Sequence, residues 1–236
     1  MPSAGLGTGG YWAGNQSAVY AGVRLALSLG YRHLDTALGY RTQGALARAI
    51  DDSKVAREDL FLVSKVPGGL NGSETAHAIE QSLAELRTTT IDLMLIHFPG
   101  SWAGVGSPSL RQESWRALEA AWARGQLRAI GVSHFCPRHV EDLLKLGGKA
   151  PIAVNQVEYH CGMGPSSVNQ TDGPGFDRLR GILFESFMPF CGQCHDDELL
   201  NGELTTGIGK AHGKTGAQVA LRWLVQQGIP VIPRSG

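Results

Sequence analysis

Short apolar segments alternate with helical patterns along almost the whole chain, and this alternation most limits the folds that the sequence allows. The apolar segments are nearly continuous, which is typical of parallel strands that are covered on both faces. Eight such strands with helices between them predict a (β/α)8 barrel. The expected strands are Gly5–Thr8, His33–Leu34, Leu60–Val63, Leu93–Phe98, Ala129–His134, Ile152–Tyr159, Ile182–Phe187 and Ile229–Ser235.

The segments between the strands show helical spacing. Gln16–Gly30 has apolar residues on one helical face, which we expect to be buried. The residues on this face are Ala18, Ala21, Leu25 and Leu29. Further along, Thr215 and Gln218 form a capping-box pattern that predicts the start of a helix. The stretch from Met188 to about Thr206 has no clear pattern and is expected to be a long loop.

Polar residues gather where the expected strands end. They are Asp35, Lys65, His97, Ser133, His134, Gln156, Arg234 and Ser235. In a closed barrel the carboxyl ends of the strands form one rim, which is where catalytic groups lie. In an open doubly wound sheet the same ends lie along a line, and only those near the switch point would meet. The barrel therefore predicts a single active site made of these residues.

Asp35 and Tyr40 suggest acid catalysis at this rim. A phenol is a weak proton donor at its ordinary pKa of about 10. It becomes useful when a nearby cation stabilises the phenolate, and such a cation needs an anion of its own. Lys65, at the end of another expected strand, supplies the cation, and Asp35 supplies the anion.

The glycine-rich segment Gly5–Gly10 leaves a second fold open. It matches G-x-G-x-x-G, and the acidic residue Asp35 follows it, as in a Rossmann dinucleotide-binding unit. That fingerprint needs a strand before its first glycine, and only four residues precede Gly5. The barrel is favoured, with residues 1–236 as one domain, because no repeat or linker divides the chain.

Composition excludes several classes of partner. Of 236 residues, 21 are Lys or Arg and 21 are Asp or Glu, so the formal net charge is zero. This balance indicates neither nucleic acid nor an acidic membrane surface as a partner. No apolar run is long enough to span a membrane and no signal-peptide pattern is present, so we expect a cytoplasmic protein.

Cys191, Cys194 and His195 match the haem-attachment pattern C-x-x-C-H. Haem attachment requires export, for which there is no signal. A zinc site would need a fourth ligand, and the nearest candidate is His212. We expect this segment to be a loop above the barrel rim and expect no metal.

Six stretches of the sequence closely resemble the aldo-keto reductase family. They occur in the family's order and span nearly the whole chain: GYRHLDTALGY, REDLFLVSKV, TIDLMLIHFPG, SWRALEAAWARGQLRAIGVSHF, AVNQVEYH and AQVALRWLVQQGIPVIPRS. The resemblance implies a (β/α)8 barrel that reduces aldehydes and ketones with NADPH. It also implies a catalytic tetrad of Asp35, Tyr40, Lys65 and His97. Tyr40 would protonate the developing alkoxide while Lys65 depresses its pKa, and His97 would orient the carbonyl.

The same resemblance implies the cofactor site. Ser133 and Gln156 would hold the nicotinamide carboxamide, with His134 where the family has asparagine. Phe187 stands for a tyrosine that stacks on the nicotinamide ring, and stacking needs only the ring. Arg234 replaces a lysine that contacts the 2′-phosphate, which favours NADPH over NADH. The remaining expected contacts are Gly7, Thr8, Asp35 and Ser235.

Aromatic residues near the expected rim indicate a hydrophobic carbonyl substrate. They are Tyr11, Trp12, Phe98 and Trp102. Phe98 stands in for a tryptophan that shapes the substrate pocket in the family. The partner we expect is a small carbonyl compound, bound by a monomer.

The family continues past the last strand into a helix and a loop, whereas this sequence ends at Gly236. We therefore expect a barrel that is incomplete after its eighth strand. One alternative follows from this difference: a nucleotide-binding sensor or subunit with little or no turnover, or an inactive fragment.

Overall fold

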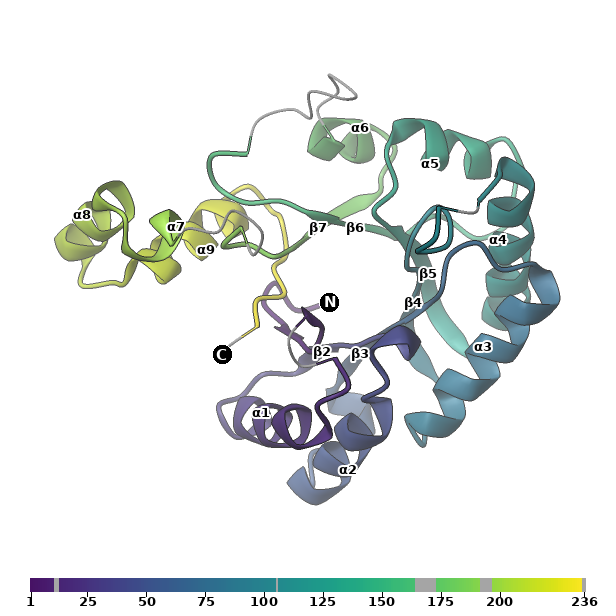
Figure 1. Ribbon diagram of the computed structural model, residues 1–236, viewed down its shortest axis with the longest axis horizontal. Helices are drawn as coiled ribbons and strands as arrows, with labels where there is room; N and C mark the ends of the chain where they lie inside the picture. Colours follow the sequence, from purple (N-terminus) through teal and green to yellow (C-terminus); the bar gives the residue numbers. More distant parts are fainter. Residues whose placement is uncertain (11–12, 105, 164–172, 192–196, 235–236) are drawn as a thin grey trace.

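The computed structural model describes residues 1–10, 13–104, 106–163, 173–191 and 197–234. Seven parallel strands form one sheet, in which each strand pairs with the next one along the chain. The sheet curls into a ring with helices outside it (Figure 1). The strands are β1 Leu6–Gly7, β2 His33–Asp35, β3 Phe61–Val66, β4 Ile91–Ile96, β5 Leu127–Ser133, β6 Val154–Glu158 and β7 Leu183–Phe187. The arrangement confirms the expected (β/α)8-type barrel.

Residues 229–233 close the ring between β7 and β1. Val231 forms isolated parallel bridges with both Ala4 and Ser186. The backbone N–H of Gly5 donates to the Val231 carbonyl at 2.9 Å. The predicted strand Ile229–Ser235 is therefore reduced to bridges, and the physical reason lies in Pro230 and Pro233. Because proline has no N–H group, it interrupts the ladder of hydrogen bonds.

Nine α-helices are present in the described residues. They are α1 Gln16–Ser28, α2 Gln43–Ser53, α3 Gly72–Glu85, α4 Pro108–Ala123, α5 Pro137–Leu144, α6 Gly173–Leu179, α7 Glu198–Asn201, α8 Glu203–His212 and α9 Gly216–Gln226. Helices α1 to α6 surround the ring of strands, α9 packs against β7 and the closing segment through Leu224, and α8 lies furthest from the ring (Figure 1). The predicted capping box at Thr215 and Gln218 is confirmed at the start of α9.

Two predictions about the helices are wrong. In α1 the buried residues are Val19, Val23, Ala26 and Leu27. Leu25 and Leu29, expected inside, are 60% and 69% exposed. Both stripes of α1 have helical spacing, so periodicity alone could not choose between them. The expected loop after Met188 contains α7 and most of the first turn of α8. Helix α8 buries only Thr205 and Gly209, so it lacks an apolar stripe that would reveal it.

A small apolar cluster fills the inside of the ring below the rim. Its buried members are Val63, Leu93, Leu95 and Val154. Side chains on a strand alternate between its two faces. Val63 and Lys65 therefore project from β3 toward the same interior, and the cluster supports the polar residues at the strand ends from below.

None of the helices in the described part of the chain has both the length and the apolar character needed to cross a bilayer.

Candidate active site

An ion pair between Lys65 and Asp35 lies inside the rim of the barrel. Lys65 Nζ donates to Asp35 Oδ1 at 2.5 Å and to the Thr36 carbonyl at 2.9 Å. The side chains of Lys65 and Asp35 are only 1% and 3% exposed. Strands β2 and β3 are neighbours, and Asp35 is in register with Val63. Lys65 lies two residues further along β3, so both side chains come from the interior face of the sheet.

Tyr40 reaches this pair from a short 3₁₀ turn, Leu38–Tyr40, that follows β2. Its hydroxyl lies 3.4 Å from His97 Nε2. Lys65 Nζ lies 5.2 Å from the centre of the Tyr40 ring. Gly9 packs against this ring, since a Cβ at Gly9 would lie 2.8 Å from Tyr40 Cζ. The four residues of the expected tetrad are thus brought together.

The protonation states of Tyr40 and Lys65 follow from burial and from their neighbours. Burial raises the pKa of Tyr40, and the charge of Lys65 lowers it by less, so the net shift is upward. Lys65 lowers the pKa of Tyr40, as expected, but burial has the larger and opposite effect, which the sequence did not reveal. Burial alone would lower the pKa of Lys65, but Asp35 and Tyr40 raise it above its ordinary value. Lys65 is a stable cation here.

His97 follows β4 and is neutral. Burial, followed by the positive charge of Lys65, lowers its pKa to about 2. A neutral imidazole has one N–H donor and one acceptor nitrogen. His97 therefore offers a hydrogen bond next to the Tyr40 hydroxyl without adding a charge to the site.

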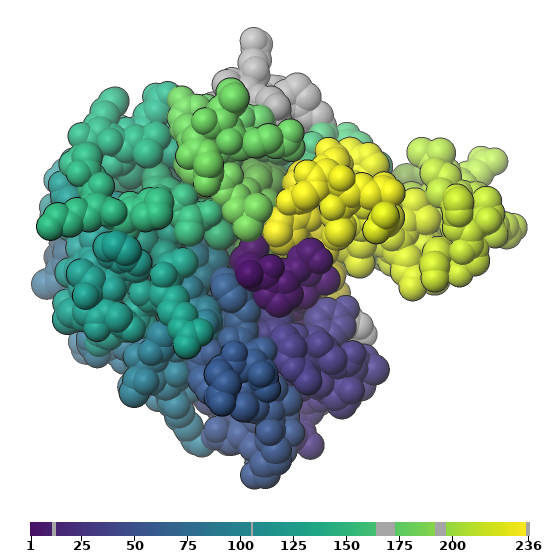
Figure 2. Space-filling view, turned by 180° about the vertical axis from the view of Figure 1, so that it is seen from behind, coloured from purple at the N-terminus to yellow at the C-terminus, as the bar shows by residue number. Residues whose placement is uncertain are grey.

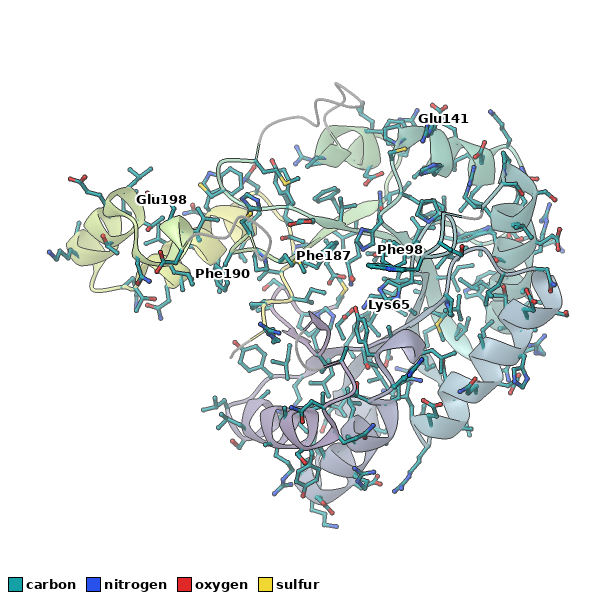
Figure 3. The ribbon with its side chains drawn as sticks, viewed as in Figure 1. Lys65, Phe98, Glu141, Phe187, Phe190 and Glu198 are labelled. Atoms are coloured by element: carbon teal, nitrogen blue, oxygen red, sulfur yellow. The ribbon has the colours of Figure 1, made fainter. Side chains whose placement is uncertain are left out.

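A row of rings continues from His97 across the rim. Phe98 stacks on His97 with ring centres 4.6 Å apart, and His134 stacks on Phe98 at 4.3 Å. His134 in turn lies 4.7 Å from the Phe187 ring. Lys65, Phe98 and Phe187 all lie in the middle of the ring of strands (Figure 3). The rings form an aromatic wall beside the tetrad.

Of the four expected substrate contacts, Phe98 and Trp102 lie side by side, with ring centres 5.3 Å apart. Trp102 is 89% exposed, so its indole has one face free for a bound molecule. Tyr11 and Trp12 lie outside the described residues.

Several expected cofactor residues have polar atoms that are suited to a nicotinamide carboxamide. Ser133 is buried, and its hydroxyl has no hydrogen-bond partner among the described residues. Gln156 donates to Asp35 Oδ2 at 2.9 Å, which places its amide against the ion pair. His134 has a left-handed backbone, with φ of 59°. Histidine, like asparagine and aspartate, adopts this region more readily than most residues.

Other expected cofactor residues have structural contacts of their own. The Thr8 hydroxyl donates to the Asp35 carbonyl at 2.9 Å. A Cβ on Gly7 would lie 2.8 Å from the Ile232 carbonyl oxygen, so glycine allows the closing segment to approach. Arg234 lies beside the glycine-rich turn, with Nη1 3.2 Å from the position of a Gly10 Cβ. Ser235 lies outside the described residues.

The Rossmann alternative is wrong. A Rossmann sheet has a strand order that reverses at a switch point. Here the order is sequential from β1 to β7. The first strand, Leu6–Gly7, lies inside the glycine-rich motif rather than before it.

Sequence reasoning gave no role in the site to Glu185 or to His33. Both are buried inside the ring with 0% side-chain exposure. Glu185 accepts a hydrogen bond from Gln156 at 2.8 Å and so belongs to the site. A signal was present, since a glutamate interrupts the otherwise apolar strand ILFESF two residues before Phe187.

No group of three or more His, Cys, Asp or Glu side chains in the described ranges is arranged to hold a metal ion. Cys194 and His195 lie outside those ranges.

Comparisons with known proteins agree with this geometry. Residues 4–172 match the model of the aldo/keto reductase family. The chain is 38% identical to glyoxal reductase of Bacillus subtilis, over the whole chain and 79% of that protein. It is 35% identical to 9,11-endoperoxide prostaglandin H2 reductase of Trypanosoma cruzi, over the whole chain and 78% of that protein.

Solved structures of aldo-keto reductases have the same fold as this chain. An aldo-keto reductase from a Medee basin deep-sea metagenome library matches with a TM-score of 0.87 at 33% identity, covering the whole chain and 80% of that structure. A putative 2,5-diketo-D-gluconic acid reductase B matches with a TM-score of 0.85 at 35% identity, covering the whole chain and 78% of that structure. The fold, the tetrad and these relatives agree, and the chain belongs to the aldo/keto reductase family of carbonyl oxidoreductases.

Proposed function

We propose that this protein reduces small, apolar aldehydes or ketones to alcohols with NADPH, as an alcohol dehydrogenase of the NADP+ type. The observation that carries the proposal is the convergence of Tyr40 and His97, with Oη and Nε2 3.4 Å apart, beside the buried Asp35–Lys65 pair. A carbonyl oxygen between these two groups would meet a phenolic acid and a neutral imidazole donor.

Tyr40 is the general acid. Its raised pKa keeps the hydroxyl protonated at neutral pH, so the proton is available as negative charge develops on the substrate oxygen. Lys65, 5.2 Å from the Tyr40 ring, stabilises the tyrosinate that remains after the transfer. Asp35 balances the charge of Lys65 and holds its ammonium group in place.

His97 orients the substrate. Because its pKa is lowered to about 2, the imidazole stays neutral at any working pH. The tautomer with a proton on Nε2 donates to the carbonyl oxygen and directs it toward Tyr40. A fixed donor of this kind stabilises developing negative charge without reorganisation.

The polar and aromatic atoms at the rim fit a nicotinamide. Ser133, whose hydroxyl is buried and lacks a partner among the described residues, would hold the carboxamide together with Gln156 and His134. Phe187 would support the flat ring. When bound, the reduced nicotinamide supplies the hydride for the carbonyl carbon. Arg234 would bind the 2′-phosphate of NADPH, because a guanidinium group suits phosphate recognition.

The substrate class is supported by the wall formed by Phe98 and Trp102, which has no charged side chain of its own. The relatives named for glyoxal and for 2,5-diketo-D-gluconic acid support a small carbonyl compound. The cytoplasmic location and the monomeric state stay predictions from the sequence.

The test begins with the purified chain, its fold checked by circular dichroism. Tryptophan fluorescence would follow titration with NADPH and, separately, with NADH, and NADPH consumption would then be measured with a panel of aldehydes and ketones. We expect binding that favours NADPH and turnover of apolar carbonyls. A folded chain that binds neither cofactor, or that binds NADPH and reduces no carbonyl, would overturn the proposal.

A further inference from the structure

Two buried polar atoms inside the barrel face each other without a hydrogen bond. Glu185 Oε1 lies 3.7 Å from His33 Nε2, and both side chains are fully buried. Neither atom has a hydrogen-bond partner among the described residues. Buried polar atoms are nearly always paired, so this arrangement requires an explanation. Viewed from behind, the first residues of the chain cover the centre of the molecule, which excludes solvent from this side (Figure 2).

The position of one proton on His33 follows from its other nitrogen. His33 Nδ1 lies 3.3 Å from the Pro2 carbonyl oxygen. A carbonyl only accepts, so Nδ1 carries a hydrogen and, in a neutral ring, Nε2 is left with a lone pair. A lone pair on Nε2 and a carboxylate oxygen would repel each other. A proton is therefore needed between His33 and Glu185.

The electrostatic surroundings place that proton on Glu185. Burial and the charge of Asp35 raise the pKa of Glu185 to about 8. Burial lowers the pKa of His33. At neutral pH both side chains are then uncharged, and the carboxylic acid points toward His33 Nε2.

The other carboxyl oxygen of Glu185 fixes the orientation of the Gln156 side-chain amide. Gln156 Nε2 donates to Glu185 Oε2 at 2.8 Å and to Asp35 Oδ2 at 2.9 Å. An amide NH2 group has two hydrogens, so both are used. A flipped amide would place its oxygen against two carboxyl groups. The orientation of Gln156 is thus determined, and Oε1 is the amide atom left to accept from a ligand.

We propose that Glu185, protonated and facing His33 Nε2, is a positioning residue that orients the Gln156 amide so that Oε1 accepts from the carboxamide of the nicotinamide cofactor. The inference rests on the proposed function and extends it to a residue behind the site. Glu185 does this without placing a second negative charge beside Asp35, which leaves Lys65 balanced by one carboxylate.

Ionisation of Glu185 would alter the chemistry. A second carboxylate close to Asp35 and Lys65 would further raise the pKa of Tyr40 and make it a weaker acid. Reduction should therefore slow as pH rises through the pKa of Glu185, near 8. The ionisable groups that act on the Glu185–His33 pair are Asp35 from β2, Lys65 from β3 and the amino group of Met1.

Three variants test the proposal. Glu185→Leu removes the acceptor and leaves Gln156 free to rotate. Glu185→Gln mimics the protonated acid, because its oxygen accepts from Gln156 while its NH2 donates to His33. Asp177→Asn is the control, because Asp177 is a buried carboxyl with a raised pKa of about 6 that accepts from Asn155 rather than from Gln156.

The measurements are the NADPH dissociation constant and the rate of NADPH-dependent reduction of an aromatic aldehyde from pH 6 to 9.5. Glu185→Leu should weaken NADPH binding about tenfold, as expected for a lost buried hydrogen bond. Glu185→Gln should restore the affinity to within about twofold and remove the decline in rate near pH 8. Asp177→Asn should leave both unchanged. If Glu185→Gln weakened binding as much as Glu185→Leu, or kept the decline, the proposal would be overturned.

Urea unfolding separates this inference from the proposed function. If the wild type bound no NADPH, the proposed function and the positioning role would fail together, while unfolding would still report the state of Glu185. A carboxyl with a raised pKa stabilises the fold at low pH and loses that contribution as pH rises through about 8. Glu185→Gln should remove this part of the decline in stability. An ion pair with His33 would instead make Glu185→Gln less stable at neutral pH.

Discussion

Lys65 Nζ lies 2.5 Å from Asp35 Oδ1, with both side chains almost fully buried at the ends of adjacent strands. A buried charge pair of this kind adds little net stability to the fold, because the cost of removing both charges from water opposes their attraction. The pair matters more for catalysis, because it holds a cation beside Tyr40 inside the protein. Hydrogen bonds extend from this pair through Gln156 to Glu185, so residues from four strands form one network.

Removal of the Tyr40 hydroxyl should abolish catalysis and leave cofactor binding intact. A positioned general acid contributes about 10²- to 10⁴-fold, so Tyr40→Phe should lower kcat by that factor. NADPH titration should give an unchanged dissociation constant. Tyr20→Phe is the control, since the Tyr20 hydroxyl is on the surface and donates to Asp52. A Tyr40→Phe enzyme with near-normal kcat would refute the role assigned to Tyr40.

Breaking the buried ion pair should cost stability. Lys65→Met leaves Asp35 as an unpaired buried charge, which typically costs about 3–5 kcal/mol of unfolding free energy. The double variant Asp35→Asn/Lys65→Met should lose less than the sum of the single variants, because the two residues interact directly. Urea unfolding measures each value. The exposed pair Arg87–Asp51 is the control, and Arg87→Met should cost under about 1 kcal/mol. Additive losses in the double variant would mean that the pair is not coupled.

Acidification should destabilise the protein through His97 without changing its role at neutral pH. Its pKa is about 2 in the folded protein, against about 6.5 when unfolded, so the unfolded chain binds the extra proton between these values. Stability should therefore fall as pH drops below about 6.5, and His97→Gln should weaken that dependence. Unfolding curves from pH 4 to 8 test this. The rate should show no acid limb from His97 above pH 5, and a limb that His97→Gln removed would contradict the prediction.

Arg234 should determine the choice of cofactor. Hydrogen bonds to charged groups contribute about 1.5–3 kcal/mol, so Arg234→Ala should weaken NADPH binding roughly 10- to 100-fold. NADH has no 2′-phosphate, and its affinity should change little. Fluorescence titrations with both cofactors, repeated at high salt, give the comparison. Equal losses for the two cofactors would place Arg234 elsewhere in the site.

Gly131 should be essential for the packing of β5 against β6. A Cβ at this position would lie 2.4 Å from the Val154 carbonyl oxygen and 2.9 Å from a methyl group of Leu95. Gly131→Ala should therefore destabilise the protein by about 1–3 kcal/mol. Gly44→Ala is the matched control, because nothing lies near its Cβ position within α2. Alanine in that helix should stabilise the protein by up to about 1 kcal/mol, as measured by thermal unfolding.

The sequence by itself determined the order of strands β1 to β7, the helices α1 to α5 and α9 between and after them, and the residues at the strand ends. Near-continuous apolar segments are a local signal, and they located strands β2 to β7 to within a few residues. Since parallel strands in a barrel share one rim, Asp35, Lys65 and His97 could be predicted to meet there before any distance was known.

Only the tertiary structure decided the rest. The buried face of α1 depends on which of two equivalent stripes meets its neighbours. The closing segment forms isolated bridges at Val231 instead of a regular strand, because Pro230 and Pro233 cannot donate hydrogen bonds to their neighbours. The raised pKa values of Tyr40 and Glu185 combine the effects of burial with those of charges on several strands. These pKa shifts depend on distances between residues that are far apart in the chain. The periodicity of the sequence carries no information about those distances.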